Sequence, residues 1–376
     1  MTVFGPPRHT GMWRNFDFAP PSRHSLRIVK MLVTGGAGFI GSCYLRLIRA
    51  RRPGDLVVNV DALTYAGNLQ NLASLASDQG HVFVRADIRD QEAMTTLLRT
   101  HGVEVVVNFA AESHVDRSVL SAQPFLDTNV SGTLRLLEAA RATGVRRFVQ
   151  ISTDEVYGSL GPTGAFEETT PISPRSPYSA SKAAADHFVA AFHHTHGMDT
   201  VITRCSNNYG PFQFPEKLIP LMILNAFDGK PLPVYGDGMQ VRDWIHVEDH
   251  CEAIDLAVTR APSGAVYNIG AENERPNLDV VRAILKHTGR DDSLIRHVAD
   301  RPGHDRRYAM NSALIRRELG WTPRHGFEGG LAATVGWYRD NNAWCDNVRT
   351  GTYRSYYDEQ YAARLTSAAS GQGDNR

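Results

Sequence analysis

Short apolar runs alternate with longer amphipathic stretches along most of this chain. The apolar runs are residues 28–34, 56–60, 81–85, 103–109, 147–151 and 200–204. Between them, apolar positions recur with helical spacing at 42–51, 68–76, 91–100, 124–143 and 177–196. Strands that alternate with helices in this way predict parallel pairing and right-handed crossovers. We therefore expect an α/β fold with a doubly wound parallel sheet.

The pattern changes near residue 205, beyond which the segments are short and irregular and the loops are dense in Arg, Asn, His and Lys. We assign 28–205 to a nucleotide-binding domain and 206–345 mainly to a smaller C-terminal α/β region that binds a polar substrate. For residues 1–27 we expect a disordered N-terminal arm; an upstream start artefact and a segment that packs on a partner are the alternatives. Residues 346–376 are expected to form a tail that frays.

Three glycines follow the first apolar run at the spacing Gly-x-x-Gly-x-x-Gly. Gly35 permits a tight turn, Gly38 lets backbone N–H groups approach a pyrophosphate, and Gly41 allows the next helix to pack closely. Asp61 ends the next apolar run, where a carboxylate can accept both ribose hydroxyls of NAD and would repel the 2′-phosphate of NADP. The pattern predicts a Rossmann-like NAD site, with Asp61 as a plain turn residue as the alternative.

Two adjacent carboxylates, Asp154 and Glu155, follow the apolar run 147–151 and Thr153. Open α/β sheets bind ligands at the carboxyl ends of their strands. We therefore expect both carboxylates in an active site. The alternative is that they solvate a loop or cap a helix.

Tyr178 and Lys182 are four residues apart on one predicted helix and so share a face. A phenolate base near neutral pH needs the pKa of Tyr178 lowered from about 10 by roughly three, or about 4 kcal/mol. The Lys182 ammonium and a nicotinamide cation have the right sign for this effect. With Thr153 bonded to the same substrate hydroxyl, these residues predict proton removal from an alcohol while its hydride passes to NAD.

Composition narrows the class of protein. The chain has 376 residues, 42% hydrophobic and 21% charged, with a formal net charge of zero. Such a chain can bury a sizeable core, and its charge gives no reason to expect nucleic acid or a membrane as partner. The four cysteines are dispersed, which favours free thiols and a cytoplasmic location. His193, His194 and His196 cluster on a polar helix end, so we expect no metal site.

Arginines in the region after residue 205 are candidates for binding a diphosphate. Arg242 and Arg301 are the better ones, because a planar guanidinium grips phosphate oxygens with two hydrogen bonds. Surface salt bridging is the alternative for each.

Eight stretches carry a resemblance to a known family. Over residues 28–345 the chain resembles the extended short-chain dehydrogenases/reductases that act on nucleotide sugars, and within them it is similar to the dTDP-glucose 4,6-dehydratases. The glycine loop is a motif of the whole superfamily. More specific motifs are Thr-Asp-Glu at 153–155 and the stretches 112–118 and 207–211. The matching stretches are 34–42, 63–68, 110–118, 152–158, 178–182, 206–211, 216–220 and 300–305.

The resemblance implies an internal redox cycle on dTDP-glucose. Tyr178 takes the C4 hydroxyl proton while NAD takes the C4 hydride. Glu155 then removes the C5 proton as Asp154 protonates the departing C6 hydroxyl, and the hydride returns to C6. The two carboxylates must hold different protonation states.

The resemblance also implies the residues of each site. The catalytic residues are Thr153, Asp154, Glu155, Tyr178 and Lys182. The NAD contacts are Gly35, Gly38, Phe39, Ile40, Gly41, Asp61, Leu63, Thr64, Asp87, Ile88, Ala110, Ala111, Ser113, Thr128, Tyr178, Lys182 and Asn208. The substrate contacts are His114, Thr153, Asn207, Glu216, Lys217, Leu218, Ile219, Pro220, Pro233, Tyr235, Arg242, Asn277, Asp300, Arg301 and His304. Arg306 and Asn311 depart from the family pattern near the nucleotide.

Three rival hypotheses stay open at this point. A nucleotide-sugar C4 epimerase shares the fold, NAD and the Tyr/Lys pair, but does not need Asp154 and Glu155. A decarboxylase of a UDP-uronate would need an arginine that binds the carboxylate, and a regulator that only binds NAD would not need the catalytic set. We rank the dehydratase first, the epimerase second and the regulator last. The family also implies a homodimer, paired through helices 124–143 and 177–196.

Overall fold

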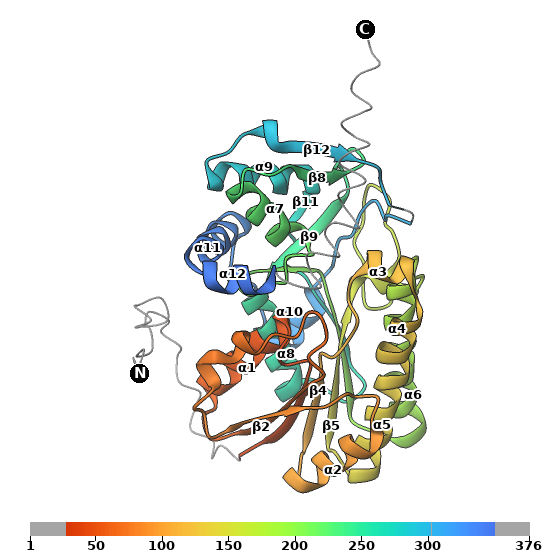
Figure 1. The fold of residues 1–376 in the computed structure, drawn as a ribbon. Coiled ribbons are helices and arrows are strands. Elements are labelled where there is room, and N and C mark those ends of the chain that lie inside the picture. Colours follow the sequence, from red (N-terminus) through yellow and green to blue (C-terminus); the bar gives the residue numbers. More distant parts are fainter. Residues whose placement is uncertain (1–27, 302, 350–376) are drawn as a thin grey trace, which may run out of the picture.

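A seven-stranded parallel sheet forms the centre of the molecule (Figure 1). The computed structural model describes residues 28–301 and 303–349, so the predicted arm 1–27 and nearly all of the predicted tail lie outside the described residues. The strand order is β10-β6-β5-β4-β1-β2-β3. The strands are β1 (Lys30–Thr34), β2 (Leu56–Asp61), β3 (His81–Arg85), β4 (Val105–Asn108), β5 (Arg147–Thr153), β6 (Thr200–Cys205) and β10 (Val266–Ile269).

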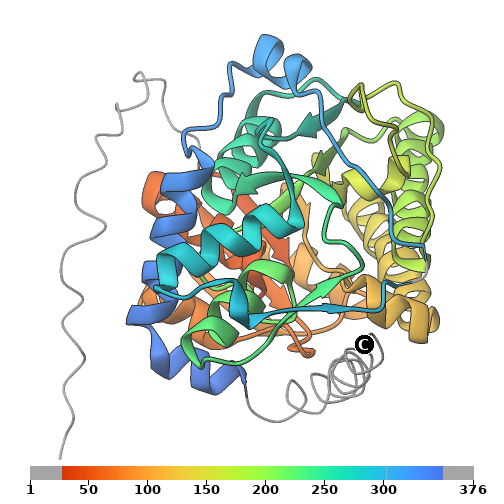
Figure 2. The same ribbon diagram turned by 90° about the horizontal axis from the view of Figure 1, so that it is seen from above.

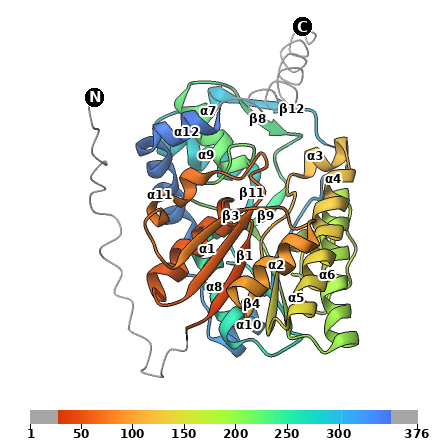
Figure 3. The same ribbon diagram turned by 60° about the horizontal axis from the view of Figure 1, so that its bottom comes forward.

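Helices cover both faces of this sheet, as Figures 1 and 3 show. One face carries α1 (Phe39–Arg51), α8 (Val247–Arg260) and α10 (Ala313–Leu319). The other carries α2 (Gln91–His101), α5 (Thr133–Thr143) and α6 (Pro177–His196). Because both faces are buried, the strands are near-continuous apolar runs rather than alternating ones. The predicted doubly wound, Rossmann-like α/β fold is confirmed.

A second, smaller region packs around its own apolar core. Its helices are α7 (Leu218–Phe227), α9 (Asn277–Thr288), α11 (Phe327–Asp340) and α12 (Asn342–Val348). β8 (Leu232–Tyr235) pairs with β12 (Ile295–Val298), and β9 (Val241–His246) pairs with β7 (Asn207–Tyr209) and β11 (Glu274–Pro276). Seen from above in Figure 2, the blue helices α11 and α12 lie on the opposite side of the molecule from the yellow-green helix α6.

The chain passes between the two regions more than once after residue 205. It returns to the main sheet to add α8 and β10, and later α10, and its last described elements, α11 and α12, belong to the second region. A sequence boundary therefore does not separate the two regions cleanly. No helix within the described ranges combines the length and the hydropathy needed to cross a bilayer.

The predicted helix 124–143 is helical throughout, but it is not one regular α-helix. The chain forms α4 (Gln123–Phe125), then a π-helical segment, η2 (Leu126–Gly132), and only then α5. Inside η2, the Asn129 amide donates to Glu112 O at 3.0 Å and to Ser181 Oγ at 2.8 Å, and it accepts from Glu112 N at 2.8 Å. A π segment widens the helix at one point, and these buried bonds hold it in that form.

Candidate active site

The glycine loop leaves β1 in the conformation that the sequence predicts. Gly35 has φ +67°, and a Cβ there would lie 2.8 Å from Ala110 N. A Cβ on Gly41 would lie 2.3 Å from Gly35 O, so the start of α1 can pack against the loop only without a side chain. The loop therefore presents bare backbone N–H groups at the N-terminus of α1, where an anion is favoured.

Asp61, at the end of β2, bonds both to the glycine loop and to the segment that follows β2. Its Oδ2 accepts from Ala37 N at 2.9 Å and its Oδ1 from Leu63 N at 2.8 Å. Leu63 itself has φ +53°, an unusual value for a residue with a side chain. Burial raises the pKa of Asp61 and these two amides lower it again. The carboxylate thus fixes the loop from within while it also lines the cavity.

One cavity of about 390 Å³ collects most of the predicted residues at the carboxyl ends of the strands. It brings the predicted catalytic residues and the glycine loop into a single space, as the fold requires of a ligand site. The predicted residues that line it are Gly35, Gly38, Phe39, Ile40, Gly41, Asp61, Thr64, Asp87, Ile88, Ala110, Ala111, Ser113, Thr128, Thr153, Asp154, Glu155, Tyr178, Lys182, Asn207, Asn208, Glu216 and Lys217. The predicted residues outside its lining are Leu63, His114, Leu218, Ile219, Pro220, Pro233, Tyr235, Arg242, Asn277, Asp300, Arg301 and His304.

The two carboxylates stand where β5 ends. Thr153 closes the strand and caps the short 3₁₀ turn η3 (Asp154–Tyr157), with its Oγ1 accepting from Glu155 N at 3.3 Å. The same hydroxyl donates to Asp154 Oδ1 at 3.2 Å. Asp154 is buried, and its Oδ2 has no hydrogen-bond partner among the described residues. Thr153 is the cap here, so the carboxylates are not present merely to solvate or cap.

The two carboxyl groups differ in their electrostatic surroundings. Burial raises the pKa of Asp154 well above its usual value, and the charge of Glu155 raises it further. Burial also raises the pKa of Glu155, but Arg301, Lys217 and Arg242 act on it in the opposite direction. The arrangement therefore favours a proton on Asp154 and a charge on Glu155.

Tyr178 and Lys182 lie together in the first turns of α6, which starts with a capping box between Ser176 and Ser179. Lys182 Nζ donates to Ile151 O of β5 at 2.6 Å, which anchors the helix to the strand that carries Thr153. Both side chains line the cavity. The phenol and the ammonium are thus fixed beside the two carboxylates.

The protein groups alone do not lower the pKa of Tyr178. Burial raises the pKa of Tyr178 well above 10, Glu155 raises it further, and the hydrogen bond with Thr153 only partly offsets this. Burial also lowers the pKa of Lys182, with Asp186 acting against it. Desolvation disfavours both charged forms, so the described residues alone do not favour the phenolate.

Basic side chains gather on the other side of the carboxylates. Lys217 Nζ donates to Ser113 O at 2.7 Å. Arg242 is buried, donates to Asp305 O at 2.9 Å and stacks over the Tyr308 ring at 4.3 Å. Arg301 pairs with Asp116 at 2.8 Å. Arg242 is therefore not a surface ion pair, whereas Arg301 does form an ion pair, with a mostly buried carboxylate.

Some residues of the site were not among the predicted contacts. Asp116 accepts from both Arg301 and Tyr235, which joins two predicted substrate residues. Glu112 and Cys205 line the cavity, and burial raises the pKa of the Cys205 thiol to about 12. Asn208, behind Cys205, is held by His250 Nδ1 at 2.9 Å. Glu112 and Asp116 lie in the family stretch 112–118, and Cys205 ends β6, so these positions were the signals that could have pointed to them.

The two departures from the family pattern have structural explanations. Arg306 forms an exposed ion pair with Asp237 at 2.9 Å. Asn311 Oδ1 accepts from Ala313 N at 2.9 Å and so starts α10. The histidines 193, 194 and 196 lie in the last turn of α6, as expected. All four cysteines are buried and free.

Three comparisons place these features among known proteins. Residues 32–334 match the family model described as GDP-mannose 4,6-dehydratase. The dTDP-glucose 4,6-dehydratase of Xanthomonas campestris pv. campestris (strain B100) is 54% identical over 341 residues, which cover 86% of this chain and 97% of the relative.

Two solved structures have the same fold. DesIV, a dTDP-glucose 4,6-dehydratase from Streptomyces venezuelae crystallised with NAD, has a TM-score of 0.83 and 49% identity, over 85% of this chain and 100% of that one. The UDP-glucose 4-epimerase of Thermus thermophilus, also with NAD, has a TM-score of 0.78 and 32% identity. The match covers 83% of this chain and 100% of the epimerase chain.

Proposed function

This chain belongs to the dTDP-glucose 4,6-dehydratase family, and we propose that it converts dTDP-glucose to dTDP-4-keto-6-deoxyglucose with NAD as its resident cofactor. The observation that carries the proposal is the pair Asp154 and Glu155 in one cavity with Thr153, Tyr178 and Lys182. An epimerase has no step that needs such a pair. The higher identity to the dehydratases than to the epimerase supports the same choice.

The residues of the cavity fit a dinucleotide. The glycine loop has no room for a Cβ at Gly35 or Gly41 and leaves backbone N–H groups free to hold a pyrophosphate. Asp61 and Asn208 both line the cavity, and we assign Asp61 to the ribose hydroxyls of NAD. When bound there, NAD supplies the acceptor and later the donor of a hydride, together with a positive charge that favours the Tyr178 phenolate.

Oxidation at C4 rests on Tyr178, Thr153 and Lys182. Tyr178 takes the proton of the C4 hydroxyl, and Thr153, whose hydroxyl bonds to Tyr178 and Asp154, orients that hydroxyl. Lys182 keeps α6 fixed on β5 through Ile151 O and contributes its charge. The product of this step is a ketone at C4, which acidifies the C5 proton.

Elimination rests on the two carboxylates. Glu155, whose charge is favoured by Arg301, Lys217 and Arg242, removes the C5 proton. Asp154, whose pKa burial raises, gives its proton to the C6 hydroxyl as it leaves as water. The same three basic residues, with Asp116 positioning Arg301, supply charge for the diphosphate of the substrate.

A direct experiment tests the proposal. Incubation of the purified protein with dTDP-glucose should yield dTDP-4-keto-6-deoxyglucose, identified by NMR and mass spectrometry. A product of unchanged mass with the C4 hydroxyl inverted would identify an epimerase instead. A protein that binds NAD and leaves the sugar unchanged would be the regulator.

We also propose a homodimer in the cytoplasm. Val119, Leu120 and Leu126 are 46%, 69% and 50% exposed, beside the helices through which the family is expected to pair. Exposed apolar side chains that form a contiguous patch are typical of an interface. A monomer in light scattering at micromolar concentration would contradict the dimer. The free cysteines support a reducing compartment.

A further inference from the structure

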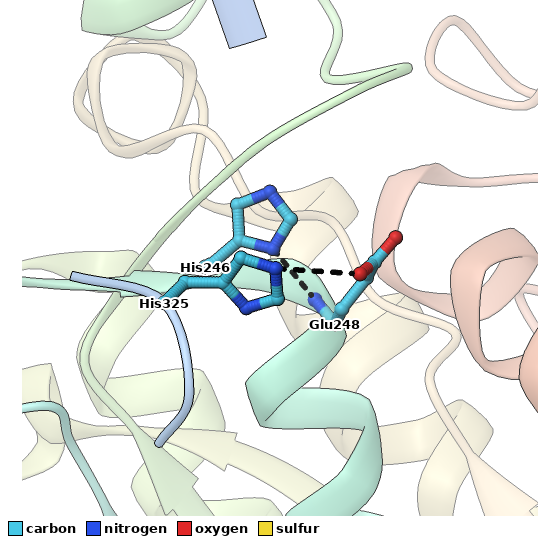
Figure 4. Close-up of side chains that lie close together, drawn as sticks. All are labelled: His246, Glu248 and His325. Carbon is cyan, nitrogen blue, oxygen red and sulfur yellow. Dashed lines mark hydrogen bonds and ion pairs between the residues drawn. The ribbon is translucent and has the colours of Figure 1, made fainter. Parts of the chain in front are cut away.

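Three potential metal ligands converge at a point that does not belong to the cavity. They are His246, the last residue of β9; Glu248, in the first turn of α8; and His325, in the connection between α10 and α11 (Figure 4). One ligand atom from each lies within 4.8 Å of the other two. None of the three lines the cavity of the proposed active site.

Asp249 orients His325 toward Glu248. His325 Nδ1 lies 2.9 Å from Asp249 Oδ1, and the backbone N–H of His325 donates to Asp249 Oδ2 at 2.9 Å. The other ring nitrogen, Nε2, is left 3.6 Å from Glu248 Oε2. A histidine that binds a metal usually has its second nitrogen bonded to a carboxylate in this way, which fixes both the tautomer and the ring.

His246 turns a ring nitrogen to the same point. Its Nδ1 accepts from Glu248 N at 3.4 Å, a long bond, and its ring stacks on that of His325 with centroids 4.1 Å apart. Figure 4 shows the two rings and the Glu248 carboxylate turned toward one another. An ion pair of His325 with Glu248 and Asp249 would also account for part of this arrangement, so the experiment must separate the two explanations.

We propose that His246, Glu248 and His325 bind a divalent transition-metal cation of the Zn²⁺ type, with Asp249 as the positioning residue. Two imidazole nitrogens and one carboxylate oxygen form a ligand set that suits Zn²⁺, with water as a fourth ligand. Tetrahedral bonds of about 2.0–2.2 Å place ligand atoms roughly 3.4 Å apart. The ligands must therefore approach one another, and the rings must leave their stacked arrangement.

The metal would join two parts of the chain that are distant in sequence and three elements of the fold. His246 lies in the sheet of the second region, Glu248 in a helix that covers the main sheet, and His325 in the connection that leads to α11. Glu248 and His325 are half-buried, which leaves an ion a path from solvent. His246 and His325 are 79 positions apart (325 − 246 = 79), so the three ligands do not form a recognisable sequence motif.

Zn²⁺ titration of the full-length, tag-free protein tests the proposal. We expect one equivalent bound in calorimetry and a thermal midpoint that rises with Zn²⁺, because an ion that binds only the folded state stabilises it. Co²⁺ should give the visible absorption of a tetrahedral site. His325→Gln and, separately, Glu248→Gln should each remove both effects, and Asp249→Asn should weaken binding about 10–100-fold.

His194→Gln is the matched control, because it removes one of the exposed histidines at the end of α6 and leaves the proposed site intact. It should bind Zn²⁺ like the wild type. Loss of binding in this control with retention in both ligand variants would place the ion elsewhere and overturn the proposal. A wild type that binds no equivalent of Zn²⁺ would also overturn it and leave the ion pair as the full explanation.

Discussion

Replacing Asp154 with asparagine removes one acidic proton from the active site and keeps the shape of the side chain. The side chain is 2% exposed, its Oδ1 accepts from Thr153, and its Oδ2 has no partner among the described residues. Asparagine can keep the acceptor at Oδ1 and places an amide where the unpaired oxygen was. Since one unpaired polar atom replaces another, the fold should change little in stability.

The expected magnitude follows from the role of the proton. Burial and the charge of Glu155 hold the pKa of Asp154 well above its usual value, which favours a proton on this carboxyl. Loss of a positioned general acid slows a reaction by about 10²–10⁴, or about 3–5 kcal/mol in the barrier. Oxidation at C4 depends on Thr153, Tyr178 and Lys182, which Asp154→Asn leaves in place. Reduced cofactor should therefore build up while water loss stalls.

Rapid mixing with dTDP-glucose measures this directly through the absorbance of the reduced nicotinamide. Asp154→Asn should show a lasting absorbance and a product rate lower by the factor above, whereas the wild type should return the hydride and show at most a brief signal. Thermal unfolding controls for the fold. A variant that forms product at the wild-type rate would refute the acid role of Asp154.

Three further predictions concern the cofactor, the first step and stability. Tyr178→Phe should block oxidation, so no reduced cofactor should appear after mixing; a wild-type signal would remove Tyr178 from the mechanism. Denatured supernatant of the purified protein should contain NAD, because each turnover regenerates it and Asp61 disfavours NADP; recovered NADP would contradict this. Burial raises the pKa of Asp243 from 3.8 to about 6, so the folded state binds more protons between these pH values and loses stability as pH rises. The free energy of unfolding of Asp243→Asn should thus equal that of the wild type below about pH 4. Above about pH 6 it should be larger than that of the wild type by up to about 3 kcal/mol (6 − 3.8 = 2.2, at 1.36 each). A difference in denaturant unfolding that does not vary with pH would argue against this.

The sequence predicted the parts of the molecule that local pattern controls. Buried parallel strands are continuous apolar runs, so β1, β2 and β5 were visible, and the glycine spacing specified the loop that Gly35 and Gly41 form. The strand-end position of Asp154 and Glu155 followed from the same pattern. These features depend on residues that are close to one another in the sequence, so a single sequence is enough to predict them.

Features that depend on distant residues could not be predicted in this way. The π segment at Asn129 exists because Glu112 and Ser181 bind its side chain from other elements. The pKa of Tyr178 rises because the fold buries it, which no i,i+4 spacing reveals. Asp116 meets Arg301 across 185 positions, and its role appears only in three dimensions.

The fate of the hydrogen at C4 tests the central claim most directly. With dTDP-glucose deuterated at C4, one hydride should leave C4 and return to C6 on the same sugar, because Glu155 and Asp154 open C6 to attack after Tyr178 has assisted oxidation. NMR and mass spectrometry should therefore find the label at C6 of a 4-keto-6-deoxy product. Label retained at C4 of an inverted sugar would contradict the account and assign the chain to the epimerases.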